Sequence, residues 1–117
     1  MSDGRLAINR IDDIYVIDFM ETRIVDQMAI NQINQELTDL ATKAGMPKFV
    51  LNFGSVTHIS SAMIGVLMTL HKACKKEGGN MRLAGINGNI MEVFKLCRLD
   101  KMMQIYPNTD AAMIKFK

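Results

Sequence analysis

Two adjacent serines, Ser60 and Ser61, stand where a polar loop gives way to an apolar helical pattern. The loop contains Thr57 and His58 and follows the apolar run 49–53, which is typical of a buried strand. The first N–H groups of a helix lack partners and carry partial positive charge, so a hydroxyl here can cap the helix and a phosphate added here is stabilised. Judged on this loop alone, the cap is the simpler interpretation.

The other candidate residues do not form a recognisable catalytic site. His58 and His71 have no marked acidic partner in the sequence, so we predict structural roles for both. Asp12 and Asp13 fall in a predicted turn. The segment 85–89 lacks the Lys-Ser/Thr ending of a P-loop and the third glycine of a dinucleotide fingerprint. We therefore expect no catalytic residues and no cofactor, and a protein that is not an enzyme.

The two cysteines lie on the apolar sides of predicted helices. Neither Cys74 nor Cys97 has another cysteine or a histidine at metal-ligand spacing. We expect both to be buried thiols rather than disulfide partners or metal ligands.

The length and net charge of the chain limit the remaining classes of function. The 117 residues fit one domain, 1–117, and the formal net charge is +2. The densest basic run, Lys72, Lys75 and Lys76, suits a solvated helix end better than a nucleic-acid surface. No signal peptide is evident, and no apolar run approaches the roughly 20 residues of a spanning helix. We expect a cytoplasmic protein without a membrane span or direct nucleic-acid contact.

The periodicity predicts alternating strands and helices. The expected elements are a hairpin over 5–20 that turns at Asp12 and Asp13, a helix after Asp26 that ends at Gly45 and Pro47, a strand over 49–53, a helix from Ser61 to Gly78, a strand over 81–86, a helix behind Asn87, a strand over 102–106 and a helix capped by Asn108. This order indicates an α/β layer fold with crossover connections. Ligands and partners of such sheets gather where strands end and helices begin, which is where the serines lie.

The run from Leu51 to Gly65 resembles the phosphorylation-site segment of bacterial anti-sigma factor antagonists, the STAS domains, whose usual form ends in Asp-Ser-Ser/Thr-Gly-Leu-Gly or Ser-Ser-Ala-Gly-Leu. Segment 78–86 is similar to the family's Gly-Gly-strand segment, and 93–100 resembles its helix before a Leu-Asp turn. The resemblance spans most of the chain. It implies a STAS fold, with a central mixed β-sheet of about four to five strands and about four α-helices.

Carried over by position, the phosphoacceptor of the family falls on Ser61, because Gly65 then matches its later glycine. Ser60 is the second choice and stands where the family often has aspartate. Two further departures are Met63, in place of a common glycine, and the segment 20–24, which lacks the usual Gly-Glu-Leu/Ile-Asp.

The resemblance implies a regulatory partner. A serine-kinase anti-sigma factor would bind at this rim and phosphorylate it, so that the domain controls sigma-factor-dependent transcription. The predicted partner-binding residues are Asn52, Thr57, His58, Ser60, Ala62, Met63 and Gly65. Exposed methionines, Met63 and the pair Met102 and Met103, could add an adaptable contact, although methionine at helical spacing more often fills a core.

Two alternatives remain open. The chain could be a STAS subunit of a transport or signalling scaffold assembly, in which the serine merely caps a helix and is not phosphorylated. It could also bind a small molecule, but no Lys/Arg cluster with a glycine-rich phosphate loop supports that, so we expect no such ligand.

Overall fold

The computed structural model describes residues 6–116, which form a mixed five-stranded sheet in the order β1-β2-β4-β6-β7. Its strands are β1 (Leu6–Ile11), β2 (Ile14–Phe19), β4 (Lys48–Asn52), β6 (Asn80–Ala84) and β7 (Gln104–Tyr106). β1 runs antiparallel to β2, and every other neighbouring pair is parallel. Two further strands, β3 (Arg23–Ile24) and β5 (His58–Ile59), pair in parallel as a separate small sheet.

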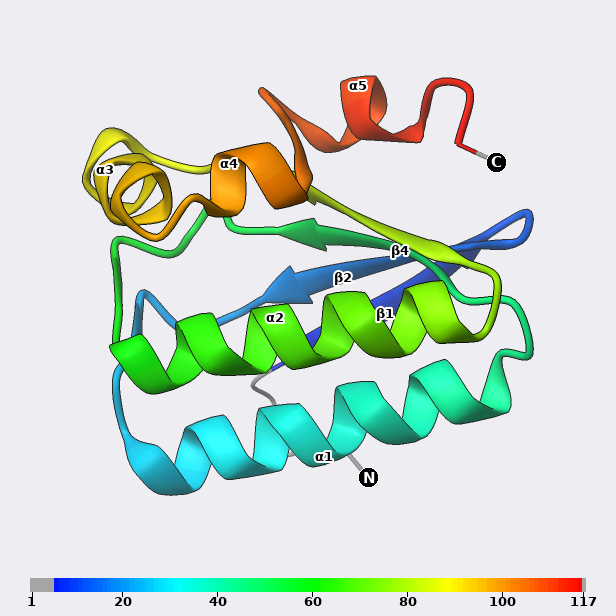
Figure 1. Ribbon diagram of the computed structural model, residues 1–117, viewed down its shortest axis with the longest axis horizontal. Coiled ribbons are helices and arrows are strands. Elements are labelled where there is room, and N and C mark those ends of the chain that lie inside the picture. Colours follow the sequence, from blue (N-terminus) through cyan, green and yellow to red (C-terminus); the bar gives the residue numbers. More distant parts are fainter. Residues whose placement is uncertain (1–5, 117) are drawn as a thin grey trace.

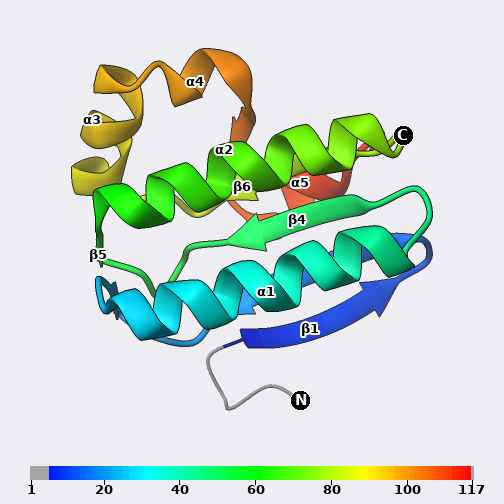
Figure 2. The ribbon, with the colours of Figure 1, turned by 60° about the horizontal axis from the view of Figure 1, so that its bottom comes forward.

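Helices cover both faces of the sheet. They are α1 (Gln27–Lys43), α2 (Ser61–Lys76), α3 (Gly88–Leu96), α4 (Leu99–Met102) and α5 (Thr109–Met113). Figures 1 and 2 show α1 and α2 side by side on one face and α5 on the other. The first turns of α1 and α2 lie at the same end of the molecule, next to β5. This α/β arrangement confirms the predicted fold class.

Alternation along β4 divides the core into two parts. Phe49 and Leu51 point to the larger apolar core under α1 and α2, whereas Val50 points to the smaller one under α5. All three side chains are completely buried. Burying an apolar side chain of this size contributes roughly 1.5–3 kcal/mol. The run 49–53 was therefore correctly predicted as a central strand covered on both faces.

The helix boundaries follow local capping chemistry. The carboxylate of Asp26 accepts a hydrogen bond of 3.0 Å from the N–H of Ala29 and caps α1 as predicted. Asn87 and Asn108 cap α3 and α5 in the same way. α1 ends just before Gly45, whose φ of +77° is a conformation that glycine adopts without strain.

The structure has five helices in residues 6–116, one more than the resemblance implied. The additional helix, α4, spans only four residues, too few to show a helical period in the sequence. It includes Met102, so the last strand begins at Gln104 rather than at 102 as predicted. β3 and β5 were also missed, because a two-residue strand has no detectable alternation. Arg5, where the predicted hairpin starts, lies outside the described residues.

The cysteines differ from the prediction in one case. Cys74 is buried as expected, and burial raises the pKa of its thiol to about 12. Cys97 is exposed, so its predicted burial is wrong. The reason is that α3 ends at Leu96 and Cys97 becomes its C-cap, which no longer follows the apolar stripe of the helix.

Candidate protein-interaction site

The predicted site lies at the end of the sheet where β2, β4 and β6 all finish. These three strands are parallel neighbours, so the loops that follow them come together at their carboxyl ends. The loop after β4 leads through β5 to the start of α2, and the loop after β6 leads to α3. The serines, Thr57 and His58 therefore belong to one rim of the molecule.

Asn52 holds the first part of this rim in place. Its side-chain amide donates to a carboxylate oxygen of Asp18 over 2.7 Å and accepts from the N–H of Gly54 over 3.0 Å. Gly85, with φ of +72°, approaches so closely that a Cβ there would lie 3.0 Å from Asn52 Oδ1. The half-buried Asn52 side chain is thus engaged within the chain, and its predicted partner contact stays a prediction.

Thr57 ties β5 to the loop after β2. Its N–H and its hydroxyl both donate to the carbonyl of Thr22, over 2.7 and 3.0 Å. The hydroxyl oxygen also lies 2.9 Å from Nδ1 of His58. This contact connects the His58 ring to the same point of the rim.

The two serines differ in the access that their hydroxyls allow. Ser61 is the first residue of α2 and is exposed. Ser60 is the N-cap, and its carbonyl accepts from the N–H groups of Met63 and Ile64 over 3.1 and 3.3 Å. The hydroxyl of Ser60 is buried and has no hydrogen-bond partner within residues 6–116. The side-chain cap considered for Ser60 is therefore absent from the described structure, and Ser61 presents the accessible hydroxyl.

At Gly65 the surface of α2 next to Ser61 has no side chain. The two residues are one turn apart and so share a face of α2, and both are exposed. A Cβ built on Gly65 would come within 4 Å of no atom among the neighbours in the described chain. Glycine inside a helix costs roughly 1 kcal/mol relative to alanine. Packing within the chain therefore does not explain why this position lacks a side chain.

Asn87 belongs to this rim and was recognised in the sequence only as a helix start. Its Oδ1 accepts from the N–H of Ile90 over 2.9 Å, and its Nδ2 donates to the carbonyl of Val56 over 3.0 Å. It thereby fixes α3 against the loop that leads to the serines. A small groove of about 100 Å³ lies there between β5 and α3, lined by Thr57, His58, Ile59, Asn89, Ile90 and Val93.

The model of the STAS domain family matches residues 5–112 of this sequence. This chain belongs to the STAS domain family. The resemblance noted in the segments 51–65, 78–86 and 93–100 is thus confirmed at the level of the family.

Several relatives of this STAS domain carry a related name. A Thermotoga maritima protein with the provisional name of anti-sigma factor antagonist is 28% identical over 103 residues, which cover 78% of this chain and 91% of that protein. The anti-sigma-factor antagonist (STAS) domain protein of Planctomyces limnophilus superposes with a TM-score of 0.86 at 18% identity, over 95% of this chain and 97% of the other. The Bacillus cell fate determinant SpoIIAA in its phosphorylated form superposes with a TM-score of 0.72 at 15% identity, over 92% and 96%.

The same fold also occurs inside a larger protein. The murine Solute Carrier 26 family member A9 anion transporter superposes with a TM-score of 0.66 at 14% identity, over 86% of this chain but only 17% of the transporter. None of the helices in residues 6–116 combines the length and apolarity needed to cross a bilayer.

Met63 corrects the predicted contact set of this STAS domain. It is completely buried and belongs to the larger core, which is the alternative that its helical spacing favoured over an exposed contact. The inward face of α2 that contains Ile64 and Leu67 also contains Met63, two residues after the exposed Ser61. Met103 is buried as well, whereas Met102 is 40% exposed. We therefore remove Met63 from the predicted contact set, whereas half-buried Ala62 stays in it.

One histidine on α2 has a shifted pKa. His71 lies within α2, and desolvation by burial, with a smaller effect of Lys75, lowers its pKa. In the part of the chain that the structure describes, no three His, Cys, Asp or Glu side chains are placed to hold a metal ion. The rim also presents the exposed residue Ser61 at the start of α2.

Proposed function

We propose that this STAS domain is an anti-sigma factor antagonist that binds an anti-sigma factor with serine-kinase activity and is released when that kinase phosphorylates Ser61. Binding would sequester the anti-sigma factor and so permit sigma-factor-dependent transcription. The observation that carries the proposal is the exposed Ser61 hydroxyl at the start of α2, next to the bare face at Gly65.

Access favours Ser61 over Ser60 as the phosphoacceptor. Phosphoryl transfer needs a hydroxyl that can align with the donor phosphate, and the Ser60 oxygen is buried. In the free domain the phosphate on Ser61 would lie near the positive end of α2, which stabilises a negative charge by roughly 0.3–1 kcal/mol. The modified domain should therefore stay folded.

Phosphorylation changes the interface more than the fold. A phosphoserine carries about −1.5 to −2 charges at pH 7, placed where the unmodified surface has a neutral hydroxyl. In an interface formed around Ser61 and Gly65, that charge would have to be desolvated or would repel the partner. Loss of the complex follows.

The first experiment is intact-mass analysis after incubation with ATP and the serine kinase encoded nearest in the source genome. We expect one added phosphate on the wild type and on Ser60→Ala, and none on Ser61→Ala. Ser55 is an exposed serine in the same loop, so the Ser55→Ala variant is the matched control, and it should still accept the phosphate. A phosphate that persists in Ser61→Ala would assign the acceptor elsewhere and contradict the proposal.

Gly65 offers a separate test of the binding surface. Gly65→Ala should raise the free energy of unfolding by about 0.5–1 kcal/mol, because its added methyl meets open space. The same methyl should weaken binding of the anti-sigma factor by roughly tenfold if the partner packs on this face. Urea denaturation and calorimetry measure the two effects. Unchanged affinity in the stabilised variant would place the partner elsewhere.

The alternative is a STAS subunit of a transport or scaffold assembly without phosphorylation. The occurrence of the same fold within the anion transporter motivates it. If the kinase phosphorylates another substrate but adds no phosphate to this domain, the scaffold hypothesis becomes the better one.

A further inference from the structure

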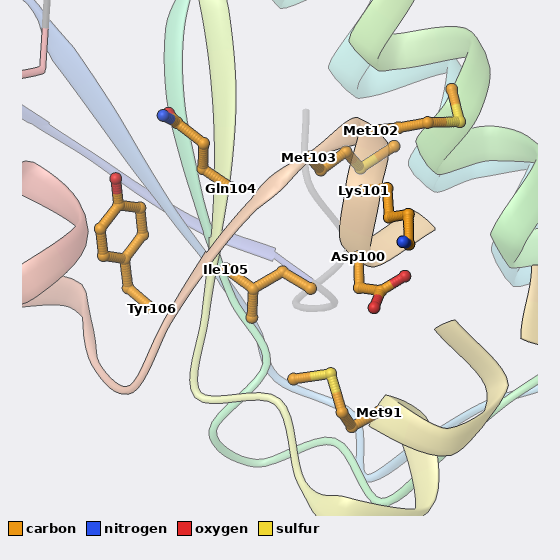
Figure 3. Close-up of a pocket in the computed structure, with 8 residues that line it drawn as sticks. All are labelled: Met91, Asp100, Lys101, Met102, Met103, Gln104, Ile105 and Tyr106. Carbon is orange, nitrogen blue, oxygen red and sulfur yellow. The ribbon is translucent and has the colours of Figure 1, made fainter. Parts of the chain in front are cut away.

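The free edge of the main sheet carries a second candidate site. Within the described residues β7 pairs on one side only, with β6. A pocket of about 500 Å³ lies beside it, lined by the continuous run 100–106 and by Met91 of α3. Figure 3 shows these side chains around the strand. The volume falls within the roughly 300–1,000 Å³ that is usual for ligand pockets.

Side chains from both faces of β7 line the pocket, so the pocket lies beside the strand, in the plane of the sheet. Ile105 packs against the larger core under α1 and α2, whereas Tyr106 packs against the smaller core under α5. Figure 3 shows Ile105 and Tyr106 on opposite sides of the strand, yet both line the pocket. A pocket lined from both faces of an edge strand occupies the position of the next strand.

The backbone of β7 offers hydrogen-bonding groups to that position. The N–H of Gly85 donates to the carbonyl of Tyr106 over 3.1 Å, so the backbone of Tyr106 faces β6. Successive residues of a strand direct their N–H and C=O groups to alternate sides. The N–H and C=O of Ile105 therefore face the open edge, where an added strand would lie about 4.7–4.9 Å away.

An acidic side chain, Asp100, also lines the pocket. Asp100 Oδ1 is buried, and no group in residues 6–116 donates a hydrogen bond to it. Figure 3 shows the Asp100 carboxylate, Ile105 and Met91 around the same space. Since Oδ1 has no accessible surface, a ligand would meet Asp100 through the part of the side chain that lines the pocket, and an ammonium or guanidinium group forms a strong hydrogen bond with a carboxylate. The complementary ligand group is thus a cation next to an apolar group.

We propose that the β7 edge binds an extended segment of a partner protein by strand addition, with a lysine or arginine of that segment on Asp100 and an apolar neighbour against Met91 and Ile105. In this mode the main-chain hydrogen bonds supply affinity and the side-chain pockets supply specificity. Met102 and Met103 were considered as additional contacts near Ser61, but no pocket residue is among the seven predicted partner-binding residues between Asn52 and Gly65. The edge therefore provides a second binding surface, and its test does not depend on the kinase.

The test is an NMR titration of the full ¹⁵N-labelled chain with two capped pentapeptides, one alternating valine with lysine and one alternating valine with glutamate, at millimolar concentrations. We expect the lysine peptide to shift the Ile105 amide signal and to slow its hydrogen exchange. The glutamate peptide should bind at least about fivefold more weakly, because it cannot pair with Asp100.

Matched variants identify the group that selects the peptide. Asp100→Asn should weaken binding of the lysine peptide by roughly fivefold or more, since it removes the charge but keeps the shape. Asp39 is an exposed acidic residue on α1, so Asp39→Asn should leave the affinity for the lysine peptide unchanged. Equal binding of both peptides, no effect of Asp100→Asn, or shifts centred on α2 instead of Ile105 would each overturn the proposal. Concentration-dependent Ile105 shifts without peptide would overturn it in favour of pairing between two copies of the chain.

Discussion

Single residues in this STAS domain behave according to their surroundings rather than their type. The two thiols are the clearest case, because Cys74 is enclosed by the larger core and Cys97 lies exposed at the end of α3. The two serines differ in the same way, with a buried hydroxyl at Ser60 and an exposed residue at Ser61. Reactivity at each position depends on access.

Thiol labelling at pH 8 tests this difference. We expect Cys97 to react promptly with a disulfide reagent, and Cys74 to react only after unfolding, because burial raises its pKa to about 12 and blocks the reagent. Cys97→Ser should therefore leave no rapidly reacting thiol. Rapid reaction of two thiols per chain in the native wild type would show that Cys74 is accessible.

At the scale of elements, short polar side chains join segments that are distant in the sequence. Asn52 links β4 to β2 and to the following loop, and Thr57 links β5 to the loop after β2. Asn87 combines a cap on α3 with a hydrogen bond to the loop before β5. Side-chain amides and hydroxyls thus help to hold the rim that carries Ser61, together with the backbone pairing of β3 and β5.

Asn87→Ala measures the contribution of one such link. The substitution removes the N-cap of α3, which accepts from the N–H of Ile90, and it leaves the carbonyl of Val56 without its donor. We expect the free energy of unfolding in urea to fall by about 1–3 kcal/mol. Asn89→Ala, at an exposed position two residues later, should change it by less than about 0.5 kcal/mol. A similar loss in both variants would argue against a special role for Asn87.

At the scale of the whole molecule, the buried Arg82 ties the sheet to the last described segment. Its guanidinium donates to Gln104 Oε1 on β7 and to the carbonyls of Ala112 and Ile114, each over 2.9 Å. It also lies over the rings of Tyr106 and Phe116, 5.2 and 4.5 Å from their centroids. One side chain thereby holds α5 and the residues after it against the face opposite α1 and α2.

Arg82→Met should release this segment. The carbonyls would lose their charged donor, and we expect a loss of roughly 2–4 kcal/mol in the free energy of unfolding. The rate of amide hydrogen exchange over residues 112–116 should rise in the same variant. Arg82→Lys should not restore protection, because one ammonium cannot reproduce the planar set of donors. Full protection in the methionine variant would show that apolar packing alone holds α5.

Local chemistry in the sequence determined much of this protein. Helical periodicity and the caps Asp26, Asn87 and Asn108 predicted the main helices, and the apolar run 49–53 predicted the central strand. These features depend on neighbours within a few residues, so a pattern along the chain is enough to find them. The placement of Ser61 at a helix start belongs to this group, whereas its assignment as phosphoacceptor came from the resemblance to STAS domains.

Only the tertiary structure decided which of these residues are accessible. The pairing of β3 with β5 and the burial of Met63 depend on segments distant in the sequence, and the exposure of Cys97 depends on where α3 ends. The pocket at β7 forms because Met91 and Asp100 come from two helices that meet beside an edge strand. Burial and pocket shape arise from packing between distant parts of the chain, which no local pattern records.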